Sequence, residues 1–238
     1  MNATEDIKIM ALLPAYNEAA HLAEVLRGVK KQISDILVVD DGSKDNTCEI
    51  ARNEGVELLS RGYNCGKGQS LKDGYAWALE HGFDAVIMLD SDGQHDPACI
   101  GDFIAKYHET HAPLIIGARD YREMPLRRRI PNMIGKMLFC AAVGREIPDN
   151  QSGYRMLDRK LMKRMLQSEE ARYHFEVEMI TICIAENWPI EWVRIPTIYG
   201  DEVSKQNPLD QLFGFPKMCL KARRMIRETR QEKCSRQE

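Results

Sequence analysis

The 238-residue sequence lacks the features that mark several common classes of protein. Its seven cysteines include no C-x-x-C pair, and an odd number cannot all pair within one chain, so we expect reduced thiols and a cytoplasmic location. No run approaches the ~20 apolar residues that span a bilayer, and MNATEDIKIM is not typical of a signal peptide. Any membrane contact is therefore expected to be peripheral. The net charge of -3 gives no whole-chain reason to expect nucleic-acid binding.

Two nucleotide-binding motifs are also missing. PAYNE follows the first apolar run, where a dinucleotide-binding protein would carry G-x-G-x-x-G. The stretch from Gly62 to Lys67 is one residue too short for a P-loop, and Gly68 stands where Ser or Thr would hold magnesium. A Gly-Lys-Gly turn that opens a helix can still bring Lys67 near a diphosphate. The alternative is a tight turn with a solvated lysine.

What the sequence does contain is a regular alternation of short apolar runs with helical patterns. Such alternation predicts an α/β fold with a mostly parallel central sheet flanked by helices. We expect one domain over residues 1–205 and a C-terminal extension over 206–238, with a basic, Pro-punctuated loop over 119–131. The strands are expected at 7–13, 36–39, 56–59, 85–89, 114–117 and 192–198, and the helices at 22–29, 47–53, 71–79, 100–107, 133–142, 159–166 and 175–186.

The run AVIML at 85–89 is followed by two carboxylates one residue apart. Five consecutive apolar residues predict a strand buried on both faces, so Asp90 and Asp92 fall where that strand ends. In an open parallel sheet this edge is where ligands bind. Two close carboxylates repel each other unless a cation neutralises them, and Mg²⁺ or Mn²⁺ is suited to such oxygen ligands. The alternative is a loop of solvated acids. Asp41, after the strand at 36–39, adds a second acidic strand end.

Six motifs, in order, resemble those of glycosyltransferase family two, and specifically its dolichyl- or polyprenyl-phosphate mannosyl- and glucosyltransferases. They are PAYNE, VVDDGSKDNT, NCGKG, MLDSDGQHDP, GAR and NQSGYRML, and the resemblance runs from about residue 7 to 205. It implies a GT-A fold that binds a nucleotide-diphospho-sugar. It also implies a metal site at Asp90, Asp92 and Gln94, and a donor site at Pro14, Tyr16, Glu18, Val39, Asp41, Lys67, Ser91 and Lys205.

The reaction that this resemblance implies is inverting transfer of mannose or glucose, from a donor such as GDP-mannose or UDP-glucose, to polyprenyl or dolichyl phosphate. A phosphate acceptor is already an anion and needs only to be held, which suits guanidinium groups. The candidate catalytic residues are Asp92, Arg119, Arg128, Asn132 and Asp149. Which of Arg127, Arg128 and Arg129 holds the acceptor stays open, and a solvated basic loop is the alternative.

Other functions remain open at this stage. With a hydroxyl acceptor, Asp149 or Glu178 would serve as general base, whereas Asp149 could also simply orient Arg155. Glu176 and Glu178 begin an apolar helix, where acids are favoured for the helix dipole alone. From another class, the chain could be a non-catalytic nucleotide-sugar-binding subunit that works with a membrane-anchored partner.

The C-terminal extension combines apolar and basic residues. Over 209–230, Leu, Phe, Met and Ile are set among lysines and arginines, a pattern typical of a helix on an anionic membrane surface. The alternative is a terminal helix that packs its apolar side on the domain. Just before it, the stretch 199–205 resembles a segment near the donor in the family, which makes Lys205 a candidate diphosphate contact.

Overall fold

The computed structural model describes residues 7–170, 174–198 and 208–235. A seven-stranded sheet in the order β3-β2-β1-β4-β6-β5-β7 forms its centre, and only β6 runs antiparallel to its neighbours. The strands are β1 Ile9–Ala15, β2 Ile36–Asp40, β3 Glu57–Ser60, β4 Ala85–Met88, β5 Leu114–Arg119, β6 Arg155–Asp158 and β7 Ile190–Ile195. The expected α/β class and mostly parallel sheet are confirmed.

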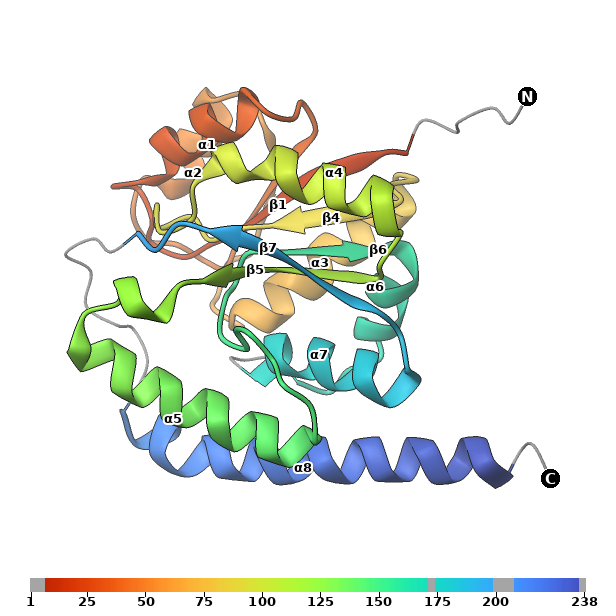
Figure 1. Cartoon of the computed structure of the whole chain (residues 1–238). Coiled ribbons are helices and arrows are strands. Elements are labelled where there is room, and N and C mark those ends of the chain that lie inside the picture. The colour runs from red at the N-terminus through yellow and green to blue at the C-terminus, as the bar shows by residue number, and fades with distance from the viewer. Residues whose placement is uncertain (1–6, 171–173, 199–207, 236–238) are drawn as a thin grey trace.

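Helices cover both faces of the sheet, and each face has its own core (Figure 1). One core packs the sheet against α1 Leu22–Lys30, α2 Thr47–Asn53 and α4 Ile100–Thr110. The second core packs the opposite face of the sheet against a larger group of helices: α3 Lys67–Glu80, α5 Leu126–Val143, α6 Arg159–Met165, α7 His174–Glu186 and α8 Pro208–Ser235. Two short 3-10 helices, η1 Pro97–Cys99 and η2 Tyr121–Glu123, complete the chain.

Strand β4 lies at the centre of the sheet, with β1 on one side and β6 on the other. All four of its residues are buried, as a continuous apolar run predicts for a strand covered on both faces. The parallel strands β1, β2, β4 and β5 all end at the same edge. Because β6 is antiparallel, it is the start of β6, at Arg155, that lies at this edge beside Met88. The loop before β6 is therefore brought to the strand ends.

The structure contradicts one local expectation and contains one strand that the sequence does not predict. The expected loop over 119–131 contains η2 and then the start of α5, which begins at Leu126 and includes Pro131. Pro125 directly precedes the first helical residue, and Pro131 lies in the second turn. The helix therefore loses a single backbone hydrogen bond, close to its N-terminus. Strand β6 was not expected, because a four-residue strand that begins with an arginine has too short an apolar run to indicate a strand.

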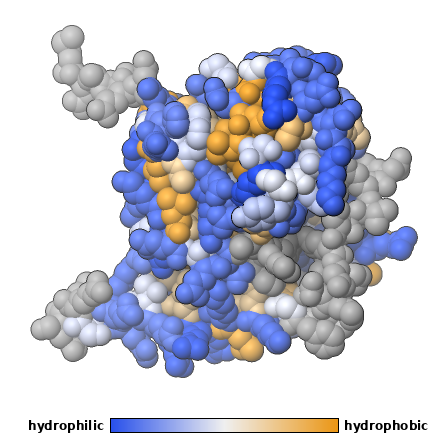
Figure 2. Space-filling model, turned by 180° about the vertical axis from the view of Figure 1, so that it is seen from behind, coloured by the Kyte–Doolittle hydropathy of each residue, from blue (hydrophilic) through white to orange (hydrophobic). Residues whose placement is uncertain are grey.

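The C-terminal helix α8 packs along α7 and α5 (Figure 1). Its residues Met218, Cys219, Ala222 and Ile226 are buried and belong to the larger core. This is the arrangement expected of a terminal helix that packs its apolar side on the domain. From behind, the lower edge of the molecule, where α8 lies, is mostly hydrophilic (Figure 2). None of the helices in the described part of the chain has the combination of length and hydropathy that a membrane-spanning helix requires.

Candidate active site

The loop after β1 is tied to the loop after β2. Asn17 adopts a left-handed conformation with φ of 55°, and its backbone N–H donates to Ser43 Oγ at 2.8 Å. Its side-chain Oδ1 in turn accepts from the N–H of Lys44 at 2.8 Å. The backbone N–H of Glu18 donates to Thr47 Oγ1 at 2.9 Å. These bonds fix the PAYNE segment, so that Pro14, Tyr16 and Glu18 are each partly exposed at the sheet edge.

Asp41 is buried after β2, and its carboxylate holds the loop that precedes α3. Its two oxygens accept from the backbone N–H groups of Cys65 at 2.8 Å and Gly66 at 2.7 Å, and Arg61 forms an ion pair with it at 3.1 Å. These two N–H groups are thereby already engaged. The phosphate-binding role expected of the Gly-Lys-Gly turn therefore depends on Lys67 rather than on them.

Two other predicted donor residues have structural partners. Ser91 is buried and donates a hydrogen bond to the Pro14 carbonyl at 2.9 Å, which joins the end of β4 to β1. Val39 is fully buried within β2, and its side chain belongs to the core. The Val39 side chain thus has a place in the sheet packing, and the expected donor contact of this residue remains a prediction. Lys205 lies outside the described residues.

Lys67, Asp90 and Glu176 form a charged cluster at the end of β4. The Lys67 ammonium, in the first turn of α3, forms ion pairs with Asp90 Oδ1 and with Glu176 Oε1, the latter at 2.9 Å. Burial lowers the pKa of Lys67, but the two carboxylates more than offset this, so that pKa lies well above its ordinary value. Burial alone would raise the pKa of Asp90, but the neighbouring Lys67 ammonium outweighs the effect of burial, and the pKa of Asp90 is lowered to about 2. Lys67 and Asp90 are therefore both charged at neutral pH.

Gly153 makes this cluster sterically feasible. A Cβ atom at this position would lie 2.7 Å from Asp90 Oδ2, 3.1 Å from Lys67 Nζ and 3.2 Å from Glu176 Oε1. The first distance is below any normal contact, so a side chain here would displace the carboxylate. The sequence predicts no role for Gly153 and leaves the role of Glu176 open. The available signal for Gly153 is its place in the QSGYR motif, but its position depends on the antiparallel strand β6, which the sequence does not predict.

His95 supports Asp90 from the other side. Its Nδ1 accepts a hydrogen bond from the Asp90 backbone N–H at 3.0 Å, and its ring lies against Tyr154 with centroids 5.0 Å apart. Burial is the main cause that lowers the pKa of His95 to about 4, so the ring is neutral at pH 7. This arrangement gives His95 a structural role beside Asp90.

The donor atoms at the end of β4 fit a hard divalent cation that shares its coordination with a substrate. Asp90, Asp92 and Gln94 are all partly exposed and offer only oxygen ligands, which Mg²⁺ and Mn²⁺ prefer. Within the described ranges, no group of three His, Cys, Asp and Glu residues is arranged to hold a metal by itself. One or two carboxylates with phosphate oxygens and water completing the shell are the usual arrangement for magnesium. The predicted metal ligands remain a prediction.

Arg119, the last residue of β5, is held by a buried carboxylate. Its Nε donates to Asp149 Oδ2 at 2.7 Å and its Nη2 to Asp149 Oδ1 at 3.1 Å, a bidentate pair. Asp149 is fully buried, and it also accepts from Tyr121 Oη at 3.2 Å and from the backbone N–H of Gln151 at 2.9 Å. Burial raises the pKa of Asp149, but Arg119 outweighs it, so that pKa is below its ordinary value.

These contacts revise the expectations for Asp149. The carboxylate orients Arg119, whereas Arg155 donates to the backbone carbonyls of Ser152 at 2.8 Å and Asn150 at 3.3 Å. A buried carboxylate with a lowered pKa and several donors is a poor proton acceptor. Asp149 is therefore placed to position an arginine rather than to act as the general base that a hydroxyl acceptor would need.

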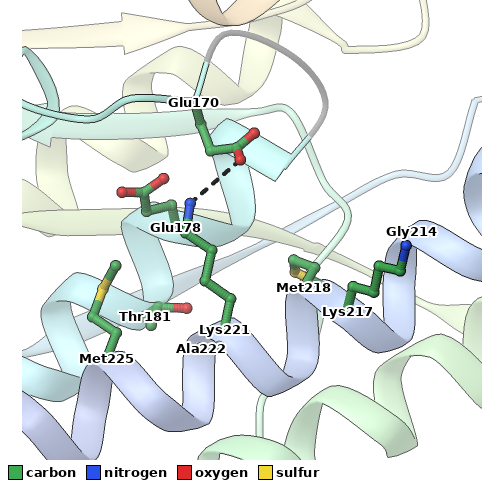
Figure 3. A pocket seen from close by; sticks show the side chains of 9 residues that line it. All are labelled: Glu170, Glu178, Thr181, Gly214, Lys217, Met218, Lys221, Ala222 and Met225. Atoms are coloured by element: carbon green, nitrogen blue, oxygen red, sulfur yellow. Dashed lines mark hydrogen bonds and ion pairs between the residues drawn. The ribbon is translucent and has the colours of Figure 1, made fainter.

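The remaining predicted residues lie on α5 and α7. Arg128 and Asn132 lie one turn apart in α5 and are both partly exposed, and Asn132 Nδ2 donates to Met124 Sδ at 3.6 Å. Glu178, the second candidate base, lies on α7 two residues after Glu176. It accepts a hydrogen bond from Ser168 Oγ at 2.9 Å and lines a cavity of about 250 Å³ between α7 and α8, near the Glu170–Lys221 ion pair (Figure 3). This position argues against Glu178 as a catalytic base.

The mostly parallel sheet, with acidic strand ends and an arginine beside them, has the arrangement expected of a glycosyltransferase of the GT-A fold. The family model described as glycosyl transferase family 2 matches residues 11–166, and the chain belongs to this family. The resemblance identified from the six motifs is thus confirmed, as is the prediction that the chain is a glycosyltransferase.

Three known proteins illustrate the relationship. Protein MJ1222 of Methanocaldococcus jannaschii is 31% identical over 90% of this chain and 91% of its own length. The UDP-N-acetylglucosamine--dolichyl-phosphate N-acetylglucosaminyltransferase of Methanococcus voltae is 28% identical over 88% of this chain and 93% of its own. In fold, the chain is similar to glucosyl-3-phosphoglycerate synthase of Mycobacterium tuberculosis, solved with Mn²⁺, UDP and glucosyl-3-phosphoglycerate. The TM-score is 0.69 and the identity 19%, over 91% of this chain and 78% of that one.

Proposed function

We propose that the protein transfers a hexose from a nucleotide-diphospho-sugar to a polyprenyl or dolichyl phosphate, with inversion at the anomeric carbon and with Mg²⁺ or Mn²⁺ as cofactor. A phosphate oxygen of the acceptor attacks the anomeric carbon from the face opposite the diphosphate. The bond from that carbon to the diphosphate oxygen breaks, and its electron pair leaves with the nucleoside diphosphate. Since the acceptor is already an anion, the step needs no proton transfer.

The observation that carries this proposal is the pairing of Arg119 with the buried Asp149. A guanidinium held by one carboxylate keeps its fixed charge and its orientation, both of which suit the recognition of a phosphate. The same pairing takes away the base that a hydroxyl acceptor would require. The polyprenyl or dolichyl class of acceptor is supported by the name of the Methanococcus voltae relative, which acts on dolichyl phosphate.

On the donor side, this chain's own charges are suited to a diphosphate. Asp90, Asp92 and Gln94 would hold the metal ion, which would supply positive charge to the leaving diphosphate. Lys67 provides a second cation beside Asp90, and Glu176 fixes its position. Pro14, Tyr16, Glu18 and Asp41 would border the nucleoside. Peripheral contact with a membrane, where the lipid acceptor resides, belongs to the same proposal.

The experiment is transfer of labelled sugar into a product that organic solvent extracts. Purified protein is incubated with polyprenyl phosphate and with GDP-mannose, UDP-glucose or UDP-N-acetylglucosamine, with and without Mn²⁺. Metal-dependent label in the organic phase from one donor is the expected result. Metal-dependent release of free nucleoside diphosphate without a lipid product would favour a hydroxyl acceptor. No turnover with any donor would favour the non-catalytic subunit or the need for a membrane-anchored partner.

A further inference from the structure

Helix α5 leaves an unusual apolar surface exposed to solvent. Its exposed large side chains have exposures between 40% and 68%, and they are Leu126, Ile130, Met133, Ile134, Met137 and Leu138. Their spacing of three, four, seven and eight residues places them on one side of the helix over four turns. Soluble monomers rarely expose contiguous apolar patches of this extent, and such patches mark interaction sites. We refer to these six residues as the α5 apolar face.

The opposite side of α5 already has its packing partners. Gly135, Phe139 and Val143 are buried, and a Cβ at Gly135 would lie 3.5 Å from the ring of Phe215 on α8. Figure 1 shows α5 and α8 side by side, and they are in contact. The α5 apolar face therefore points away from the core, and the described side chains of α8 leave it exposed.

The charges of α5 indicate what covers the face. From Leu126 to Val143 the helix carries Arg127, Arg128, Arg129 and Lys136, and it contains no Asp or Glu. A helix with an apolar face and only cationic charges is suited to the interface of a bilayer with anionic lipids. A second copy of the chain is a poorer partner, because a two-fold contact would bring identical cationic helices together.

The position of α5 along the chain also supports contact with a membrane. The chain runs from Arg119 at the end of β5 through η2 directly into α5, so the face begins seven residues after the arginine proposed to bind the acceptor phosphate. A lipid whose apolar chain remains in the bilayer can present its phosphate to Arg119 only if the membrane lies close to this part of the molecule. This step rests on the proposed function.

We propose that α5 is the membrane-docking element, with its apolar face inserted at the lipid interface and its arginines on anionic headgroups. This differs from the one of the two sequence-based alternatives that placed membrane contact in the C-terminal segment 209–230. There, Met218, Cys219, Ala222 and Ile226 are used in the core, and among the described residues of α8 Leu220 is the large apolar side chain left exposed.

The test uses two variants with matched exposure. Met137 on α5 is 67% exposed and Leu220 on α8 is 68% exposed. The full-length wild type, Met137→Glu and Leu220→Glu are sedimented with phosphatidylcholine vesicles that contain or lack phosphatidylglycerol. We expect wild-type binding to require phosphatidylglycerol and to weaken with salt. Met137→Glu is expected to reduce vesicle partitioning about tenfold or more, with Leu220→Glu close to wild type.

Several results would overturn the proposal. They are the absence of wild-type binding to phosphatidylglycerol vesicles, an equal loss in both variants, and a wild-type dimer in solution that Met137→Glu converts to a monomer without affecting vesicle binding. Unchanged circular dichroism and thermal midpoint show that each variant is folded. Transfer to a short-chain, water-soluble isoprenyl phosphate, measured without vesicles, should be the same in all three proteins. If that transfer is absent while vesicle binding behaves as expected, the proposed function fails and the docking element stands.

Discussion

The edge of the sheet and the outer side of α5 differ in how their energetically unfavourable groups are stabilised: buried charges at the edge have partners, whereas apolar side chains on α5 are exposed to solvent. At the edge, charged side chains are drawn into partly or fully buried positions, and each is balanced by a partner, as Arg119 is by Asp149 and Lys67 by Asp90 and Glu176. On α5, six large apolar side chains are left exposed and the flanking cations have no acid on their own helix. These buried pairs are balanced within the chain, whereas the α5 surface is complete only with a partner.

The largest expected effect tests the balance of charge at the edge. Asp149→Asn keeps the shape of the side chain but removes the buried charge that holds Arg119. Breaking a buried pair by removing one partner costs about 3–5 kcal/mol, and we expect a loss of this size in the free energy of unfolding, measured in urea at pH 7. A loss below about 1 kcal/mol would mean that the pair is not important for stability.

The same pair predicts a dependence of stability on pH. The folded-state pKa of Asp149 is below its ordinary value of 3.8, so its contribution is present above that value and is lost as pH falls below it toward the folded pKa. Wild-type stability should therefore decrease below about pH 4. The decrease should be smaller in Asp149→Asn, and an identical slope in the two proteins would exclude Asp149 as its source.

A second variant separates catalysis from stability at the edge. Asp92 is partly exposed, so Asp92→Asn should leave thermal unfolding nearly unchanged. Turnover should fall by about 100-fold or more, because the metal ion contributes several kcal/mol to stabilisation of the leaving group. The rate is measured with saturating donor over a range of Mn²⁺ concentrations. Asp102→Asn, an exposed acid on α4, is the matched control; full activity in Asp92→Asn would refute the metal assignment.

Much of this edge could be predicted from the sequence. A continuous apolar run at 85–89 places Asp90 and Asp92 at a strand end, and the alternation of strands and helices places Asp41 at the same edge. The partners of these residues could not be predicted in the same way. Glu176 comes from α7 and Gly153 from the loop before β6, so both depend on tertiary contacts and on one antiparallel strand that is too short to recognise.

The prediction for α5 failed for a different reason. Residues 119–131 contain five arginines and two prolines, which favour a loop when read locally, and the apolar residues from 126 onward gave no sign of whether they face the core. In α8 the reverse occurred: a pattern typical of membrane binding is satisfied by packing on α7 and α5. Periodicity shows that a helix has an apolar side, but only the tertiary structure shows what covers that side.

Gly153→Ala tests the close packing in the charged cluster. Its Cβ would lie 2.7 Å from Asp90 Oδ2, so the carboxylate must move away. Overpacking costs about 1–3 kcal/mol, and we expect activity to fall about tenfold or more, with a raised donor KM. Gly101→Ala is the control, because its Cβ would meet nothing within 4 Å and alanine favours the α4 helix. Wild-type kinetics in Gly153→Ala would show that the cluster adjusts without cost.

The smallest change in the free energy of unfolding is expected for a substitution on the α5 apolar face. A small change would show that the substituted side chain is not packed against protein. Ile134 is 53% exposed, so Ile134→Gln removes little buried area and should change the free energy of unfolding by less than about 0.5 kcal/mol. Vesicle binding should weaken in the same protein, since the lost apolar contact is with lipid. If urea unfolding instead shows a loss above about 1.5 kcal/mol, Ile134 is packed against protein in solution. The comparison between a self-contained edge and a surface that needs a partner would then fail.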